Sequence, residues 1–471
     1  MHMTVPINQR KPGHDRLEQH RFLEPFRDLF THREDGSSWP RWQNTAATAP
    51  AYLRGLLGPG AGKNMHGIAK RVDRDDDQIE RFVRESPWEH EAVQTHLVNH
   101  VPKQILNPHA VLNVDDVALV KKGKMSVAAY RQYCGATGKV DECQVAVDVI
   151  YTSPDPDRNA DQKTWPLGMQ LYVPQGWLED SEYDLARDAA QVPADVEFLT
   201  KHDIALQMID RARHLPHAAI GGDAGYGDNG EFRRRLRERN EPYVLGVTPS
   251  QPRLIPADTP IQAPQRAGPQ GGRPETHPTH TPTVKRESPR NLAQRVTQWE
   301  TIEWSEGTKG HLTGEFWRTK VRVVEGPKER RWVTDEVVWL VLEKRSNQLK
   351  AYLCWGFDDA TLEELVGLAH SRWTIEQFHR EAKQMLGLDQ FEGRSWKGWH
   401  HHVTMVLLAY AYLALHRAQT TADHPPTLPK TANAIVLEIA TQRLVTKHRL
   451  KRPKARKIAR TVLLEFSEWE D

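Results

Sequence analysis

The residues of this 471-residue chain that are best suited to chemistry are acids in two apolar stretches. Asp115 and Asp116 lie within VLNVDDVAL, which predicts a buried strand, and a pair of carboxylates there is costly unless another group satisfies its charge. Asp223 directly follows the apolar stretch AAIGG, at the carboxyl end of a second expected strand. Open sheets with parallel strands bind their ligands at that end, so Asp223 is placed where a reacting group would lie.

A third acid, Glu376, belongs to a helix expected to begin near Thr361, where Thr361 and Glu364 have the spacing of a capping box. Glu376 lies at the edge of the apolar stripe of this helix, which comprises Leu362, Leu365, Ala369 and Trp373. Cations recur four residues before, four residues after and seven residues after Glu376 on the same helix face, namely Arg372, Arg380 and Lys383. This face would therefore present one carboxylate and several cations to a phosphate backbone.

Carboxylate oxygens are the ligands that Mg²⁺ prefers. Two such ions held close together activate a water or a 3′-hydroxyl and stabilise the leaving oxygen of a phosphodiester. Taken singly, each acid is more commonly a cap, a turn residue or a surface charge, but the three together, with the cations beside Glu376, favour a metal site. We therefore expect Asp115, Asp223 and Glu376 to bind two Mg²⁺ ions, and on these grounds alone Asp116 stays an alternative to Asp115.

Strands and helices follow one another in an order that positions these acids. Apolar patterns predict three strands (110–119, 145–149 and 167–173), a helix (204–212), a strand (218–222), a helix (231–239) and a strand (243–247). Antiparallel strands followed by helix-linked parallel strands are typical of an α/β, ribonuclease-H-like fold. The last helix of that fold is absent from this run and is supplied by the helix that begins near Thr361.

The ribonuclease-H-like core is therefore interrupted, by a Pro- and Gly-rich flexible linker and by a β-rich insertion. The first hundred residues predict short helices, among which residues 68–83 fit either a helix-turn-helix or a plain helical hairpin. The expected parts are a helical, DNA-binding domain (1–105), the first part of the core (106–247), the linker (248–295), the insertion (296–356), the second part of the core with the helix of Glu376 (357–425) and a basic C-terminal segment (426–471).

Positive charge is concentrated near the C-terminus, although the net charge of the chain is only +2. The cluster comprises Arg443, Lys447, Arg449, Lys451, Arg452, Lys454, Arg456, Lys457 and Arg460. Such a cluster either contacts DNA phosphates, which releases counterions, or is a solvated helix end. The same two interpretations apply to Lys121 and Lys122, which follow the first strand of the core.

The composition argues against several classes of protein. No run of about 18 apolar residues predicts a membrane span, and the first residues lack the apolar segment of a secretory signal. The three cysteines lack metal-site spacing, which favours a reducing cytoplasm and argues against structural zinc. The sequence has no phosphate-cradling glycine loop. We therefore expect a cytoplasmic, nucleoid-associated protein that binds no membrane and no nucleotide cofactor.

Three stretches of the chain resemble the catalytic blocks of one known family. They are NVDDVALVKKGKMSVAAYRQYCGATGKVDECQVAVDV, GDAGYGDNGEFRRRLRERNEPYVLGV and RWTIEQFHREAKQMLGLDQFEGRSWKGWHHHVTM. The first and third resemble blocks of DDE transposases of the IS701 group, within the wider IS4-like set, and are long and specific. The shorter second stretch gains weight from its position, and the resemblance runs from residue 42 to residue 412.

This resemblance implies roles for particular residues. The catalytic acids of the family fall on Asp115, Asp223 and Glu376, and its flanking Arg and Lys fall on Arg372 and Lys383.

Within the first block, Asp115 is preferred to Asp116 because it takes the place of the Asp in the wider Asp-Gly-Thr pattern. The chain departs from the family at Val117, where a Thr is frequent, and at Ala369, where the wider set often has a Tyr.

The resemblance also implies cut-and-paste transposition, in which the enzyme cuts at terminal inverted repeats and joins the freed 3′ ends to target DNA. It implies Mg²⁺ with Mn²⁺ able to substitute, double-stranded DNA as the partner, and a homodimer acting on paired ends. In some IS4-like relatives a Trp of the insertion receives a flipped base, and the candidates here, most of them expected in the core of the insertion, are Trp304, Trp317, Trp332 and Trp339. Two alternatives stay open: a structure-specific nuclease that never joins DNA, and a domesticated DNA-binding protein, against which the retention of all three acids counts.

Overall fold

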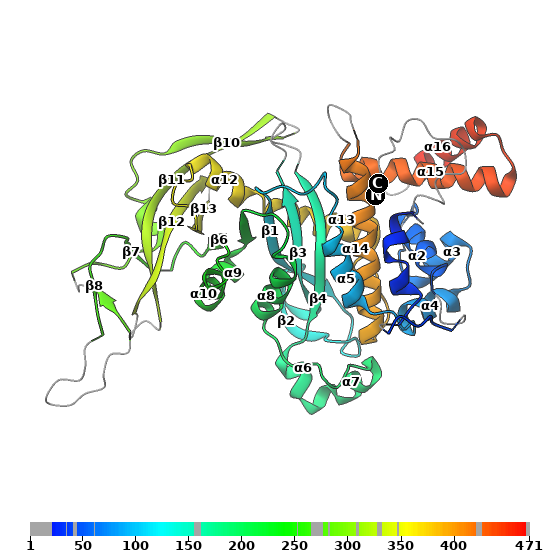
Figure 1. The fold of residues 1–471 in the computed structure, drawn as a ribbon, viewed down its shortest axis with the longest axis horizontal. Coiled ribbons are helices and arrows are strands. Elements are labelled where there is room, and N and C mark those ends of the chain that lie inside the picture. The colour runs from blue at the N-terminus through cyan, green and yellow to red at the C-terminus, as the bar shows by residue number, and fades with distance from the viewer. Residues whose placement is uncertain are drawn as a thin grey trace.

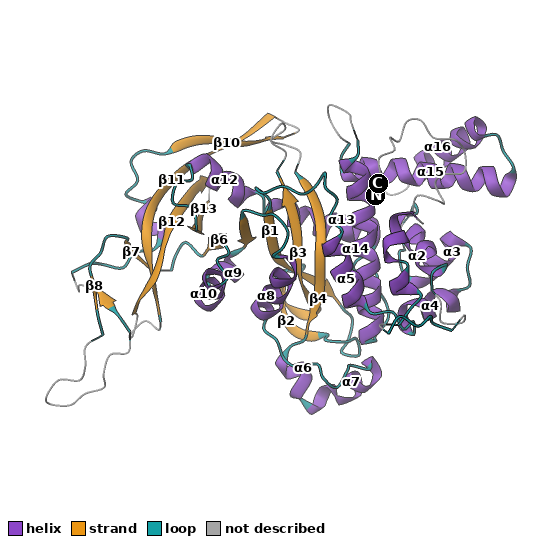
Figure 2. Ribbon diagram, viewed as in Figure 1, coloured by secondary structure: helices purple, strands orange, loops and turns teal. Residues whose placement is uncertain are grey.

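A mixed sheet of eleven strands runs through the part of the chain that the computed structural model describes (Figure 1). Helices cover this sheet and extend from one end of it, as the colouring by secondary structure in Figure 2 makes clear. The described residues are 21–33, 35–40, 45–60, 62–154, 162–251, 253–264, 277–280, 283–307, 310–326, 332–345, 348–420 and 426–467.

The core of the sheet is formed by β1 (Val111–Val120), β2 (Tyr130–Cys134), β3 (Lys139–Ser153), β4 (Lys163–Tyr172), β5 (Ala219–Gly222) and β6 (Tyr243–Val247). β3 pairs antiparallel with β1 on one side, and with β2 and then β4 on the other. β1 pairs in parallel with β5, and β5 in parallel with β6. Antiparallel strands that lead into helix-linked parallel strands confirm the ribonuclease-H-like fold expected from the sequence.

Helices cover both faces of the core sheet (Figure 1). On one face α8 (Lys201–Ala212) packs on β3 and β4, and a capping box of Thr200 and Asp203 fixes its first turn. On the other face α13 (Trp373–Leu386) contacts β1 and β3, and α14 (Trp396–Ala418) contacts β4. Shorter helices join the strands: α6 (Gln175–Glu179), η4 (Ser181–Tyr183), α7 (Asp184–Ala190), α9 (Ala224–Gly227) and α10 (Gly230–Glu238).

The β-rich insertion continues the core sheet instead of forming a separate layer. Its strands are β10 (Glu300–Gly307), β11 (Gly310–Glu325), β12 (Trp332–Arg345) and β13 (Gln348–Trp355). Consecutive strands pair antiparallel, and β13 pairs with β6 of the core. The insertion is thereby joined by backbone hydrogen bonds to the strand next to β5.

Part of the Pro-rich segment that was expected to be a flexible linker is ordered. β7 (Leu254–Pro256) pairs with β11, and the side chains of Leu254 and Ile255 are buried. The segment also contains β8 (Ile261–Gln262), β9 (Thr279–His280) and α11 (Pro289–Ala293), whereas residues 265–276 lie outside the described residues. Pairing with a strand far along the chain orders β7, and the composition of the segment does not reveal that pairing.

The long helix expected to begin at Thr361 is two helices. α12 (Leu362–His370) begins at the predicted capping box, and α13 follows after a break at Ser371. Ser371 is buried, and its carbonyl accepts a hydrogen bond of 3.3 Å from the Asn113 side chain of β1. The break lets α12 pack on the insertion strands while α13 packs on β1, and it leaves Trp373 47% exposed, outside the apolar stripe predicted for it.

Short helices precede the core, namely η2 (Glu24–Phe26), η3 (Asp28–Phe30), α2 (Thr48–Leu57), α3 (Met65–Val72), α4 (Asp76–Arg84) and α5 (His90–Asn99). A tight turn joins α3 to α4, and within it Asp73 has a φ of 58°. The start of α4 exposes the carboxylates of Asp75, Asp76 and Asp77. Three negative charges at this end of the helix oppose a phosphate backbone, which favours a plain helical hairpin over a helix-turn-helix that reads DNA.

Buried histidines connect these N-terminal helices to α14. The ring of His401 stacks on Trp88 with centroids 3.7 Å apart, and His402 Nδ1 lies 2.8 Å from the Tyr52 hydroxyl oxygen. The histidine run of α14 is therefore part of the packing between these helices.

The chain continues from α14 into α15 (Leu428–His448) and α16 (Arg452–Ser467), which pack against each other. Figure 1 shows this pair at the end of the molecule opposite the insertion. None of the described helices combines the length and the apolar character needed to cross a membrane.

Candidate active site

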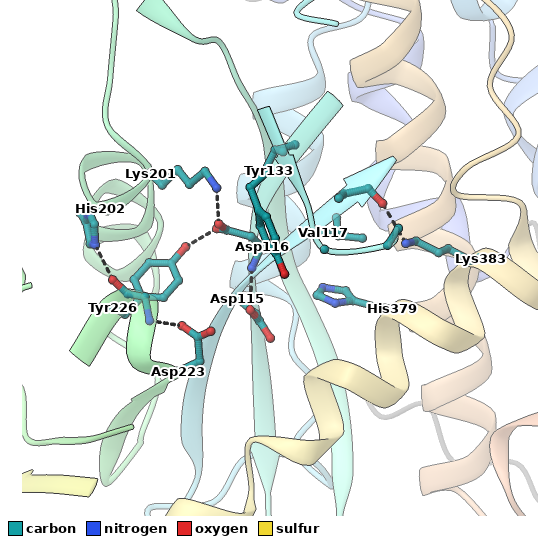
Figure 3. Close-up of a pocket in the computed structure, with 15 residues that line it drawn as sticks. Asp115, Asp116, Val117, Tyr133, Lys201, His202, Asp223, Tyr226, His379 and Lys383 are labelled. Carbon is teal, nitrogen blue, oxygen red and sulfur yellow. Dashed lines mark hydrogen bonds and ion pairs between the residues drawn. The ribbon is translucent and has the colours of Figure 1, made fainter. Parts of the chain in front are cut away.

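Asp115 lies in β1 just past the residues that pair with β5, and Asp223 directly follows β5, the neighbouring parallel strand. The register of β1 and β5 pairs Asn113 with Gly221. Asp115 and Asp223 each come two residues later, so the alternation of side chains along a strand puts both carboxylates on the same face of the sheet. Both line a cavity of about 700 Å³, and Figure 3 shows their carboxylates directed into the same space.

The electrostatics of this pair suit a cation. Burial raises the pKa of Asp115 to about 7; the Arg372 guanidinium opposes this rise and the charge of Asp223 adds to it. Asp223 is fixed by the backbone N–H of Gly225, which donates to its Oδ1 at 2.8 Å. Two carboxylates that act on each other in this way supply both the negative charge and the oxygen donors that a divalent metal ion requires.

Arg372 links the third acid to this pair. Its Nη1 donates to Asp115 Oδ2 at 2.9 Å, and its Nη2 contacts Glu376 one turn along α13. The Glu376 side chain is 58% exposed and is not part of the cavity lining. The guanidinium thus contacts both acids, and the described residues contain no group of three or more His, Cys, Asp or Glu arranged to hold a metal ion.

Asp116, the alternative to Asp115, points to the opposite face of the sheet. Its Oδ1 accepts a hydrogen bond from the Tyr226 hydroxyl at 2.7 Å, and its Oδ2 contacts Lys201 Nζ of α8 at 2.6 Å. Both oxygens of Asp116 are therefore engaged by groups that the sequence pattern did not single out. Asp115, and not Asp116, therefore shares a face of the sheet with Asp223, although all three line the cavity.

Sequence reasoning missed an ion pair beside Asp115. Asp148 of β3 is the cross-strand neighbour of Asp115, and its Oδ1 contacts His379 Nε2 of α13 at 2.8 Å. Burial raises the pKa of Asp148; burial by itself would lower the pKa of His379, but the charge of Asp148 raises it above its ordinary value. The signal available in the sequence was an acid inside the apolar strand VAVDVIY, with a histidine three residues after Glu376.

Among the cations predicted on the face of Glu376, Arg372 and Lys383 reach the strand of Asp115. Lys383 lines the cavity, and its Nζ donates to a backbone carbonyl of β1 at 2.9 Å. Burial lowers the pKa of Lys383. Arg380 is exposed on α13 and is not part of the cavity lining.

The cations outside α13 that were predicted to contact phosphates differ in how exposed they are. Lys121 is half-buried and its Nζ donates to a backbone carbonyl at 2.8 Å, whereas Lys122 is exposed. Near the C-terminus, Lys451 is exposed and Arg452 contacts Glu438 of α15. Lys122 and Lys451 therefore present their charges to solvent more openly than their neighbours do.

The four tryptophans considered for base stacking all have protein neighbours. Trp304 and Trp332 each stack on a histidine ring, with centroids 4.1 and 4.4 Å apart. Trp339 donates its Nε1–H to a backbone carbonyl at 2.9 Å, and Trp317 packs against the main hydrophobic core. All four are half-buried, and three of them pack against a hydrophobic core, so they lie at its edge and not inside it.

This chain is similar to a known protein family and to a curated relative. A family model described as "DDE superfamily endonuclease" matches residues 31–311, which include Asp115 and Asp223 and end before Glu376. Over 191 residues the chain is 26% identical to a "Probable transposase for insertion sequence element IS701" from Microchaete diplosiphon. That likeness covers 39% of this chain and 44% of the relative, so the chain spans less than half the length of the curated relative that it matches. The family match covers more than half of the chain, and the chain therefore belongs to the DDE superfamily of endonucleases.

Proposed function

We propose that this chain is a DNA transposase that cuts at the terminal inverted repeats of a transposon and joins the freed 3′ ends to target DNA. One observation carries the proposal: Asp115 and Asp223 share one face of a ribonuclease-H-like sheet beside a cavity, and Arg372 ties Glu376 to Asp115. The likeness to a probable transposase for IS701 supports joining of DNA over hydrolysis alone.

Endonucleases of the DDE superfamily generally use divalent metal ions, and the carboxylates of Asp115 and Asp223, which line one cavity, suit such an ion. Burial and the neighbouring charge of Asp223 raise the pKa of Asp115, and a bound cation would relieve both effects. We take Asp115, Asp223 and Glu376 as the ligands of two Mg²⁺ ions, which Mn²⁺ could replace. Two such ions, when bound, would lower the pKa of a water molecule and stabilise the leaving oxygen of a phosphodiester.

The cations of α13 supply the contacts to the scissile phosphate. The planar guanidinium of Arg372 presents five N–H donors, so it can contact a carboxylate through one edge and a phosphate oxygen through another. Lys383 adds a positive charge at the cavity wall. Water attacks at the transposon end, and the freed 3′-hydroxyl then attacks a target phosphodiester. One P–O bond forms as another breaks in that second step, so no nucleotide cofactor is needed.

Double-stranded DNA is the proposed partner, held outside the cavity by basic surface. α16 and the residue before it expose the side chains of Lys451, Lys454, Arg456, Lys457 and Arg460. Several cations in one place bind phosphates through the release of counterions. We propose that this surface and the N-terminal helices, apart from the acidic start of α4, hold the transposon ends. Two copies of the chain would act on paired ends, in the cytoplasm at the nucleoid.

The test is excision and joining in vitro. Purified full-length protein is incubated with Mg²⁺ and a plasmid that carries the gene's own flanking DNA, and wild type is compared with Asp223→Asn and with Asp210→Asn. Asp210 is an exposed acid of α8, paired with Arg239 outside the cavity, so its change is a matched control. We expect excised and joined products from wild type and Asp210→Asn, and a loss of about 100-fold or more in Asp223→Asn.

The other outcomes distinguish the alternatives. Cleavage without joined products would assign the chain to the structure-specific nucleases. Binding of the DNA without cleavage by any of the three proteins would favour a domesticated DNA-binding protein. Equal activity of Asp223→Asn and wild type would refute the assignment of Asp223.

A further inference from the structure

An exposed tyrosine, Tyr133, lies in the wall of the catalytic cavity. It belongs to β2, which pairs with the first part of β3 at the edge of the core sheet. Its side chain is 66% exposed, yet it lines the same cavity as Asp115 and Asp223. Figure 3 shows the ring between the side chains of Lys201 and His379 in this view.

The ring of Tyr133 is on the catalytic face of the sheet. Tyr133 pairs with Val140 of β3, and Asp148, eight residues after Val140 on that strand, pairs with Asp115. Side chains alternate along a strand, so an even separation puts Val140 and Asp148 on one face, together with their partners Tyr133 and Asp115. The β2–β3 hairpin thus carries an aromatic ring on the same face as the catalytic acids.

Open space surrounds this ring within the part of the chain that the structure describes. There its hydroxyl has no hydrogen-bond partner and its ring has no aromatic neighbour, and Val140 opposite it is 52% exposed. The turn that follows β2 brings Gly135 and Ala136 into the cavity wall, and a Cβ added to Gly135 would meet no atom within 4 Å. A planar group can therefore approach the ring without displacing another side chain.

We propose that Tyr133 stacks on a nucleobase of the DNA strand that enters the cavity, an inference that rests on the proposed function. Aromatic rings stack on the faces of all bases, so such a contact suits an enzyme that must position DNA at the cut irrespective of the base there. Arg131, exposed and two residues earlier on β2, lies on the same face about 7 Å away. A ring beside an exposed cation matches the alternation of base and phosphate along a strand of DNA, and it does not match an uncharged protein surface.

Tyr133 is in this view a positioning residue. Stacking of one base would fix the nucleotide next to the scissile phosphate, and thereby the distance of that phosphate from Asp115 and Asp223. The ring acts through its π-face, and its hydroxyl has no part in the contact. A Phe at this position should therefore replace the Tyr, whereas an Ala should not.

The experiment measures binding of the full-length protein to fluorescent duplexes from the gene's own flanking DNA, in EDTA so that no cleavage occurs. One duplex is intact, and the others carry a single abasic site at successive positions around the transposon end. Wild type is compared with Tyr133→Ala, Tyr133→Phe and Leu185→Ala. Leu185 is 76% exposed on α7 and outside the cavity, so its change is a control for loss of exposed apolar surface.

We expect Tyr133→Ala to weaken binding of the intact duplex about 10-fold, with Tyr133→Phe and Leu185→Ala within about twofold of wild type. At one abasic position wild type should lose the same factor, and Tyr133→Ala should lose nothing further, because a contact that is already absent cannot be removed twice. A merely structural role of Tyr133 would give additive losses at every position. Melting temperatures of the variants confirm that each protein is folded.

Three results would overturn the inference. If wild type cleaves the plasmid and Tyr133→Ala binds every duplex as wild type does, the stacking contact is wrong and the transposase proposal stands. If Tyr133→Ala instead changes the sedimentation of the protein without DNA, the face binds a second copy of the chain. If wild type neither binds nor cleaves the flanking DNA, the proposed function fails and the inference fails with it.

Discussion

Replacing Glu336 by Gln should destabilise the protein far more than replacing the neighbouring Asp335 by Asn, although each change removes one carboxylate charge. Glu336 of β12 and Arg233 of α10 have side chains that are each 1% exposed, and they contact each other at 2.7 Å. The Tyr243 hydroxyl donates to the same carboxylate. Asp335 is 91% exposed and lies 3.1 Å from Arg237. The two positions therefore share the chemical change and differ in burial.

The magnitude follows from what each change leaves behind. Glu336→Gln leaves the guanidinium of Arg233 buried, with Glu325, whose side chain is 26% exposed, as its remaining carboxylate partner. Breaking a buried pair in this way costs about 3–5 kcal/mol, and because Glu325 still compensates part of the charge we expect about 3 kcal/mol. The exposed pair of Asp335 is worth about 0–1 kcal/mol.

Thermal unfolding of the full chain, followed by tryptophan fluorescence, measures this difference. At about 2.1 cal/mol/K per residue, the unfolding entropy of this 471-residue chain is about 1 kcal/mol/K, so the melting temperature should fall by about 3 °C for Glu336→Gln and by less than about 1 °C for Asp335→Asn. Circular dichroism of both variants before heating serves as the check that they start folded. Equal shifts, or a larger shift for Asp335→Asn, would refute the reasoning that this buried ion pair stabilises the joint between α10 and the insertion.

Three further predictions concern the site and the buried histidines. Arg372→Ala should reduce Mg²⁺-dependent cleavage of the plasmid on the order of 100-fold, because the Arg372 guanidinium contacts Asp115 and Glu376. Arg380→Ala, on the exposed side of α13, should reduce cleavage less than about threefold. Similar losses in the two variants would contradict the proposed role of Arg372. Asp115→Asn should reduce the same cleavage on the order of 100-fold or more, whereas Asp116→Asn should keep at least about a tenth of the wild-type activity. A larger loss of activity in Asp116→Asn than in Asp115→Asn would make Asp116 the catalytic acid. Burial lowers the pKa of His402 to about 4 from the ordinary 6.5. The unfolded chain therefore binds more protons between these values, so stability that is fully present above pH 6.5 should be lost as the pH falls toward 4, by on the order of 3 kcal/mol for this residue. Melting temperatures from pH 8 to pH 5 should show this fall, and His402→Gln should make it shallower; an unchanged slope would rule out the burial of a neutral imidazole as its cause.

The buried ion pair of Arg233 also connects the insertion to the turn that carries Asp223. Besides Glu336, the guanidinium donates to the Gly227 carbonyl at 2.6 Å, at the end of α9. α9 is the short helix that begins directly after Asp223. The insertion strands thus support the turn that carries Asp223 through the single side chain of Arg233. This contact gives the insertion a structural role next to the candidate site.

Local pattern was sufficient to predict the neighbourhood of two acids and the order of most core elements, but it missed β2. The strands expected at residues 110–119 and 218–222 correspond to β1 and β5, and the acids lie where the pattern put them, in β1 and directly after β5. Burial and alternation are properties of each strand by itself, so they can be read without knowing what packs on it. The capping box at Thr361 was likewise a local signal, and the structure has it at the start of α12.

What the tertiary structure decided is which groups meet. Asp115, and not Asp116, lies on the face of β1 that α13 covers, and the Ser371 carbonyl at the helix break accepts a hydrogen bond from Asn113, 258 positions away in the sequence. The pair of Asp148 and His379 joins residues separated by 231 positions.

The sequence by itself thus determined the ribonuclease-H-like order of elements and a short list of acids, because the hydrophobic periodicity of each element depends on its own residues. Only the tertiary structure decided that β7 pairs with β11, that the insertion extends the core sheet, and that Arg372 lies between Asp115 and Glu376. The physical reason is that register and packing are set by contacts between distant segments. A shift of one residue in a strand exchanges its two faces without changing the local pattern.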